Sequence, residues 1–185
     1  MAPEYQILVG HRRFNSDLTF CEPVMKILNL GSCCVDHVYH VPYFVAPGET
    51  LLCSNYTIHP GGKGLNQSIA MARAGIEVCH AGKIGPDGVW LKDLLDETGV
   101  NTEQLIISTQ PTGHASIQVS DSGENAIVLF GGANRTITVP ELETMMADFK
   151  EGDLVLFQNE TSELAAAMGI ARRKGLGIIF NAAPM

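Results

Sequence analysis

Apolar residues along the chain gather in short runs that glycine, proline and polar turns separate. Four of these runs are continuous and short enough to be buried strands, at residues 27–31, 78–83, 154–157 and 178–180. Elsewhere the apolar residues recur at helical spacing, which predicts helices over 65–74, 87–99, 140–149 and 162–174. The closing strand–helix–strand order predicts an α/β fold, a doubly wound and mostly parallel sheet with helices on both faces.

Two further regions alternate between apolar and polar residues. In the region 113–130, Ala115, Ile117 and Val119 point one way, and a turn at residues 121–123 predicts a hairpin. The segments 37–43 and 50–58, on either side of a turn, are similarly rich in strand-forming residues. We therefore expect a small antiparallel sheet built from about 37–58 and 113–130, with one face exposed or covered by a ligand or partner.

Composition narrows the class of protein. The 185 residues include 45% hydrophobic residues, and 12 Lys+Arg against 20 Asp+Glu give a net charge of −8. An acidic chain without a basic run argues against binding to nucleic acid or to an anionic membrane. No apolar run reaches membrane-spanning length, and the N-terminus lacks the pattern of a signal peptide. Residues 1–24 show no period, so we expect an extension there and one domain over 25–185.

The cysteines indicate the redox environment. Five are scattered along the chain without a C-x-x-C pair, which favours reduced thiols and a cytoplasmic protein. Cys33 and Cys34 are adjacent, but no basic partner lies near them in sequence, so buried thiols are expected rather than a nucleophile. His37 and His40 would lie on opposite faces of a strand, so no metal site is predicted there.

Residues 60–75, PGGKGLNQSIAMARAG, place three glycines around one lysine just before a predicted helix. The pattern fails as a P-loop because Gly64, and not Ser or Thr, follows Lys63. It fails as a dinucleotide fingerprint because Gln67 occupies the third glycine position. What remains is an open backbone with the Lys63 ammonium and the Asn66 amide, donors that suit the hydroxyls of a sugar. The alternative is a glycine-rich helix entry with a solvated lysine.

Polar side chains follow three of the predicted strands. Asp36 comes after the first strand, Glu160 after the strand at 154–157, and Asn181 ends the strand at 178–180. Ligands of parallel sheets bind beyond the carboxyl ends of the strands, so we expect these side chains at one rim. Each of them could separately be a turn residue or a helix-start charge.

Several motifs in combination resemble the ribokinase branch of the PfkB-type sugar kinases. They are G-S-x-x-x-D at 31–36, G-G-K-G-x-N at 61–66, I-G-x-D-G at 84–88, P-T-G at 111–113 and G-G-A-N at 131–134. The resemblance runs from Met25 to the last residue. It implies a ribokinase-like fold, an ATP-dependent sugar kinase acting on ribose, and a homodimer formed through the small sheet, which would be a lid over the sugar.

The resemblance also implies roles for individual residues. Those that would contact the sugar are Cys34, Val35, Asp36, Gly62, Lys63, Gly64, Leu65, Asn66 and Glu160. Asn181 would lie on the nucleotide side, and ATP, Mg²⁺ and a monovalent cation, K⁺, would be the cofactors. Cys34 stands where the family pattern has an asparagine, which leaves the exact sugar open.

The family's catalytic aspartate and glycine anion hole belong to a G-A-G-D element that is absent from these 185 residues. We therefore expect no catalytic residue in this chain, and a sugar-binding part that is inactive alone. The alternatives are a kinase of another sugar, a sugar acid or a nucleoside, and a non-catalytic binding or dimerisation module.

Overall fold

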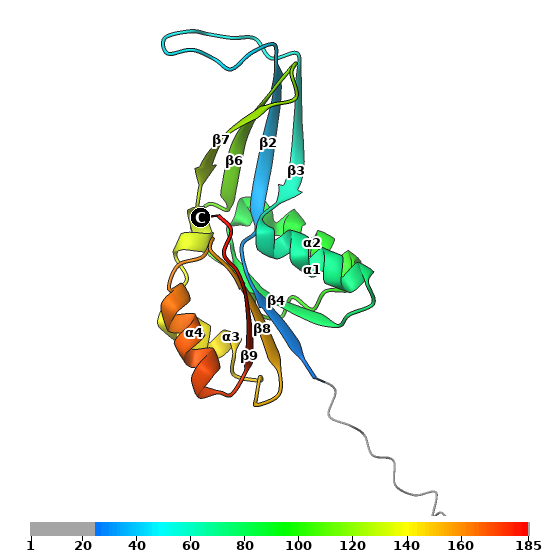
Figure 1. Cartoon of the computed structure of the whole chain (residues 1–185), viewed down its shortest axis with the longest axis vertical. Helices are drawn as coiled ribbons and strands as arrows, with labels where there is room; N and C mark the ends of the chain where they lie inside the picture. Colours follow the sequence, from blue (N-terminus) through cyan, green and yellow to red (C-terminus); the bar gives the residue numbers. More distant parts are fainter. Residues whose placement is uncertain (1–24, 185) are drawn as a thin grey trace, which may run out of the picture.

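The computed structural model describes residues 25–184, which form two sheets (Figure 1). The larger sheet is parallel, with the strand order β5-β4-β1-β8-β9. Its strands are β1 (Ile27–Leu30), β4 (Val78–Ile84), β5 (Leu105–Ile107), β8 (Leu154–Gln158) and β9 (Gly177–Asn181). The predicted extension at 1–24 lies outside the described residues.

Helices cover both faces of the parallel sheet (Figure 1). On one face lie α1 (Lys63–Arg73) and α2 (Val89–Glu97), and on the other α3 (Val139–Met145) and α4 (Leu164–Arg173), with short 3₁₀ turns η1 (Pro86–Gly88) and η2 (Gly132–Arg135). Each face has its own core: Leu65 and Leu91 belong to one, Leu142 and Phe157 to the other. The doubly wound α/β prediction is confirmed. Among the described residues, none of the helices combines the length and the apolar character that crossing a membrane requires.

The small sheet stands beyond the carboxyl edge of the parallel sheet (Figure 1). Its order is β3-β2-β6-β7, with β2 (Cys34–Val41), β3 (Asn55–Gly61), β6 (Gly113–Ser120) and β7 (Asn125–Phe130). The outer pairs are antiparallel, but the central strands β2 and β6 run parallel. The expectation of an antiparallel sheet is therefore wrong for the central pair. Each hairpin is antiparallel, whereas the long crossover through α1 and α2 brings β6 back in the direction of β2.

The boundaries of the small sheet also differ from the prediction. The strand β2 begins at Cys34, directly after the loop that leaves β1, and β3 covers 55–61 instead of 50–58. Asp36 therefore lies within a strand and not in a turn. This placement matters because it gives the Asp36 carboxylate a rigid support.

The strand β9 leaves an apolar edge open. Within residues 25–184 it pairs only with β8, and its residues Ile178, Ile179 and Phe180 are 42%, 50% and 45% exposed. An exposed apolar strand with a free edge favours association between molecules.

We expect Ile179→Lys to lower the self-association of the 185-residue polypeptide, because the charge is costly to bury against a second copy. Light scattering against protein concentration measures the effect. Ile76→Lys makes the same substitution at a residue that is 41% exposed after α1, outside β9 and the small sheet, and it is expected to change the scattering little. Equal effects of the two variants would show that net charge, and not the β9 edge, controls association.

Candidate functional site

The candidate site lies where the carboxyl edge of the parallel sheet meets the base of the small sheet. Three predicted residues gather there from separate elements: Asp36 in β2, Lys63 at the start of α1, and Glu160 just after β8. The Glu160 carboxylate pairs with the Lys63 ammonium and acts electrostatically on Asp36. Elements far apart in sequence thus bring two carboxylates and one ammonium close together.

Glu160 is held by three donors. Its Oε1 accepts a hydrogen bond from Lys63 Nζ at 2.7 Å, and its Oε2 accepts one from the Lys63 backbone N–H at 3.0 Å and one from the Ser32 hydroxyl. Burial alone would raise the pKa of Glu160, but these hydrogen bonds and the Lys63 charge outweigh burial and hold the pKa below its ordinary value. Glu160 is therefore an anion that ties β8 to the start of α1 and to the loop after β1.

Asp36 has the opposite electrostatic character. Burial raises its pKa, the nearby Glu160 carboxylate raises it further, and the charges of His59, His37 and Lys63 oppose the rise only in part. Within residues 25–184 no hydrogen bond to its carboxylate contributes to this balance. Asp36 thus presents acceptor oxygens that a ligand with hydroxyl donors could use.

The glycines of the loop at residues 61–64 are required by the protein's own backbone. Gly62 has a φ of +95°, and a Cβ there would lie 2.7 Å from the Ser32 carbonyl oxygen. A Cβ on Gly64 would lie 2.5 Å from the Ser32 nitrogen, and one on Gly61 would collide with the Asp36 carboxylate. From the sequence, this open backbone was expected to serve a ligand. In the structure the loop packs against the backbone at Gly31–Ser32, which brings α1 to the site.

The other residues predicted to contact a sugar differ in accessibility. Leu65 and Val35 are 0% and 7% exposed and belong to the core beneath the site, so their side chains support it from below. Asn66 is exposed on the first turn of α1, and its side chain is available to a ligand. Cys34 is 5% exposed, and burial, with help from the Glu160 and Asp36 charges, raises the pKa of its thiol to about 12. Cys34 is therefore a neutral thiol.

Asn181 lies at the end of β9, as predicted. Its Oδ1 accepts a hydrogen bond from the backbone N–H of Ala183 at 3.1 Å, so at least that oxygen is engaged within the chain. No hydrogen bond links Asn181 to Asp36, Lys63 or Glu160 within the described residues. The structure therefore places it on the same edge but outside the Asp36–Lys63–Glu160 group.

Two side chains that build the site were not predicted from the sequence. The Ser32 hydroxyl donates to Glu160, and the buried Asn134 clamps the backbone of Cys33, with its Oδ1 accepting from the N–H at 3.1 Å and its Nδ2 donating to the carbonyl at 2.8 Å. Both residues belong to quoted motifs, G-S-x-x-x-D and G-G-A-N. Nothing in the spacing of these motifs indicates that Asn134 reaches back across 101 residues.

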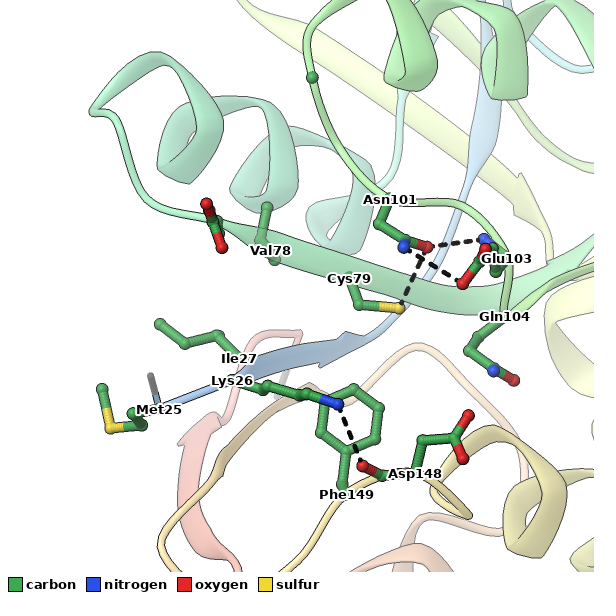
Figure 2. A pocket seen from close by; sticks show the side chains of 12 residues that line it. Met25, Lys26, Ile27, Val78, Cys79, Asn101, Glu103, Gln104, Asp148 and Phe149 are labelled. Atoms are coloured by element: carbon green, nitrogen blue, oxygen red, sulfur yellow. Dashed lines mark hydrogen bonds between the residues drawn. The ribbon is translucent and has the colours of Figure 1, made fainter. Parts of the chain in front are cut away.

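A separate cavity of about 500 Å³ opens at the opposite end of the sheet (Figure 2). Lys26 reaches across it toward Phe149, with its ammonium 6.0 Å from the ring centre, and Cys79 and Asn101 lie on another wall (Figure 2). None of the predicted site residues lines this cavity. It lies at the amino ends of β1 and β4, whereas ligands of such sheets bind at the carboxyl ends, so we keep the assignment at Asp36.

A doubly wound sheet with a small sheet over its carboxyl edge defines a ribokinase-like fold. The crystal structure of ribokinase from Cryptococcus neoformans var. grubii serotype A in complex with ADP superposes with a TM-score of 0.73, at 38% identity over 87% of this chain and 52% of that one. Residues 25–175 match the pfkB family carbohydrate kinase. The chain belongs to this family.

Individual relatives agree with this assignment. Ribokinase from Haemophilus influenzae is 41% identical over 160 residues, covering 84% of this chain and 52% of the relative. Ribokinase from Staphylococcus aureus (strain COL) is 33% identical over 165 residues, covering 86% and 54%. The chain thus spans about half the length of the curated relatives it matches.

Proposed function

We propose that this chain is the sugar-binding part of an ATP-dependent sugar kinase whose substrate is ribose. The observation that carries the proposal is the Asp36 carboxylate, whose pKa is raised and which lies near enough to the Lys63–Glu160 pair to be acted on by both charges. Family membership and the ribokinases among the relatives support ribose over other polyols.

In the proposed complex, Asp36 accepts hydrogen bonds from two adjacent sugar hydroxyls, and Asn66 and Lys63 donate to ring or hydroxyl oxygens. Lys63 has a side chain that is 38% exposed, so its ammonium can contact a ligand while it remains paired with Glu160. Glu160 already accepts from three donors, so its main contribution is to aim Lys63. Phosphoryl transfer depends mostly on positioning, and these residues would position the acceptor hydroxyl.

The cofactors belong to the proposal for the whole protein. ATP would approach from the Asn181 side, where the amide nitrogen is available as a donor. Among residues 25–184, no three His, Cys, Asp or Glu side chains gather as an all-protein metal site would require. Mg²⁺ and K⁺ thus belong to the proposal for the complete enzyme and are assigned to no residue of this chain.

The small sheet would cover the sugar and pair two subunits in a cytoplasmic homodimer. Its strand register puts Val38, Ile117 and Ile127 side by side on the face that also carries Asp36. Ile127 is 54% exposed, so this face offers apolar surface to a partner.

Isothermal titration of the 185-residue chain with ribose tests the proposal. We expect saturable binding of ribose, with weaker binding of 2-deoxyribose, fructose and adenosine. Cys34 stands where the family pattern has a polar asparagine, so the alternative substrate is a related sugar or a nucleoside. If one of these binds more tightly than ribose, it takes the place of ribose as the proposed substrate. Failure to bind any of the four would favour a non-catalytic module.

Ribose affinity is expected to fall as the pH is lowered, with a midpoint above 3.8, the ordinary pKa of this side chain. The sugar binds the carboxylate form of Asp36. Because burial raises the pKa of Asp36 in the free protein, this form is lost at a higher pH than for an ordinary aspartate. Titrations between pH 4 and 8 measure the dependence. Asp36→Asn is the control, since it should bind weakly and without this pH dependence. A retained dependence in the variant would assign it to other groups.

A further inference from the structure

Four buried polar side chains form a continuous chain beneath the candidate site. Asn29 in β1, Ser68 in α1, His80 in β4 and Cys33 after β1 are all 0% exposed. The Asn29 Nδ2 donates to Ser68 Oγ at 2.8 Å, Ser68 Oγ lies 2.8 Å from His80 Nδ1, and His80 Nε2 lies 3.3 Å from Cys33 Sγ. Polar groups at this depth need partners, and here each finds one among the others.

The contacts of Asn29 give the first hydrogen bonds of the chain a direction. Gln158 Nε2 donates to Asn29 Oδ1 at 2.7 Å, which orients the Asn29 amide so that its Nδ2 donates both to Ser68 and to the Gly64 carbonyl at 2.7 Å. Ser68 Oγ thus accepts from Asn29. The arrangement in which Ser68 gives its hydrogen to His80 Nδ1 places the His80 hydrogen on Nε2, toward Cys33. Burial lowers the pKa of His80 to about 4, so the ring is neutral at physiological pH.

This chain contacts both of the segments that form the candidate site. At one end, Asn29 holds the carbonyl of Gly64, in the first turn of α1 next to Lys63. At the other end, His80 meets Cys33, which lies between Ser32, a donor to Glu160, and Cys34. The segments also meet directly, since the Leu65 N–H donates to the Ser32 carbonyl at 2.9 Å.

No side chain separates the two segments where they touch. A Cβ on Gly64 would lie 2.6 Å from the Gly31 Cα, so backbone rests on backbone. Apolar packing around such a contact tolerates small shifts, whereas a continuous chain of buried hydrogen bonds favours one arrangement. Two features hold Asp36 and Lys63 at their spacing: the β2–β3 pairing, which sets Cys34 opposite Gly61, and this chain beneath it.

We propose that Asn29, Ser68, His80 and Cys33 form a positioning network that sets the distance between the segment 31–36 and the start of α1, and so sets sugar affinity. The effect on affinity rests on the proposed function. The effect on the spacing does not, because the Leu65 N–H bond to Ser32 reports it without any ligand.

Ser68→Ala removes the central hydroxyl and tests the network. Hydrogen exchange of the Leu65 amide, titration with ribose and a melting curve are measured on the same 185-residue protein. We expect exchange of the Leu65 amide to accelerate and ribose affinity to fall, each by roughly five- to tenfold, more than any change in global stability accounts for. In the parent protein, ¹⁵N NMR should find the His80 hydrogen on Nε2.

Thr102→Val is the matched control, because it also removes a buried hydroxyl, which donates to Asp96 at 2.5 Å away from the site. It should leave the Leu65 amide and ribose affinity unchanged. If Ser68→Ala does not fold, the same measurements are made on Ser68→Cys, in which a thiol replaces the hydroxyl as a weaker hydrogen-bond donor. Unchanged Leu65 exchange in a folded Ser68 variant overturns the network. A parent protein that does not bind ribose overturns the proposed function, and Leu65 exchange then still decides the positioning role.

Discussion

Replacing Asp36 with alanine is expected to weaken ribose binding by roughly one to three orders of magnitude. The variant loses the acceptor for two sugar hydroxyls, and each hydroxyl left unpaired costs about 1–3 kcal/mol. Hydrogen bonds to a carboxylate are stronger than those between neutral groups, so no other residue of the site compensates. Affinity for ATP should change little, because Asn181 lies outside the group around Asp36.

A melting curve on the same sample separates binding from folding. Because burial raises the pKa of Asp36, its ionised form is disfavoured in the folded state, and its removal should not lower thermal stability at pH 7. A residue that merely shaped the strand would behave in the opposite way, with a lower melting temperature and near-normal binding. Asp121→Ala, in the exposed turn of the β6–β7 hairpin, is the control. Ribose affinity that survives in folded Asp36→Ala would remove Asp36 from the site.

The 185-residue polypeptide is expected not to phosphorylate ribose, even where it binds the sugar. A general base typically contributes 10²–10⁴-fold, and one oxyanion donor about 10²–10³-fold, so without both the rate should fall by roughly four orders of magnitude or more. The carboxylates near the proposed sugar do not replace the base. Glu160 is a weak base because its pKa is lowered, and Asp36 is assigned to binding.

An ATP-consumption assay with ribose measures this directly. The comparison is a chain extended through the G-A-G-D element of a close relative, at equal concentration and saturating ribose. Turnover by the 185-residue chain at a comparable rate would mean that a base exists among these residues. Binding with no turnover, followed by turnover in the extended chain, would agree with the proposal.

Both predictions depend on the contrast between the two carboxylates. Glu160 already accepts three hydrogen bonds from Lys63 and Ser32, whereas Asp36 is partly desolvated next to a second negative charge. The protein thus keeps one acid as part of its framework and leaves the other free to bind. The cost of desolvating Asp36 is offset when hydroxyl donors arrive, which is why this residue carries the largest expected effect.

Several features of the fold could be predicted from sequence because local chemistry determines them. Continuous apolar runs identified the buried strands, helical spacing identified α1 and α4, and alternation identified the β6–β7 hairpin. The rule that parallel strands deliver their carboxyl ends to one edge was enough to expect Asp36 and Glu160 near each other. The glycine motif with Lys63 then indicated which helix begins at that edge.

The remaining features were decided by contacts between segments that are distant in sequence. The parallel pairing of β2 with β6 depends on the crossover between them, which alternation in either strand does not report. Asn29 and His80 lie in strands that read as apolar, and their purpose appears only when Ser68 is packed between them. Lys63 and Glu160 could both be identified in the sequence. Their ion pair could not, because it forms only when the fold brings the start of α1 next to the end of β8. The helices and strands, and the sheet edge where the site lies, could be predicted because the patterns that indicate them involve residues near one another in sequence. The hydrogen-bond partners that set the charge and accessibility of each site residue come from distant segments, so they exist only once the backbone is folded.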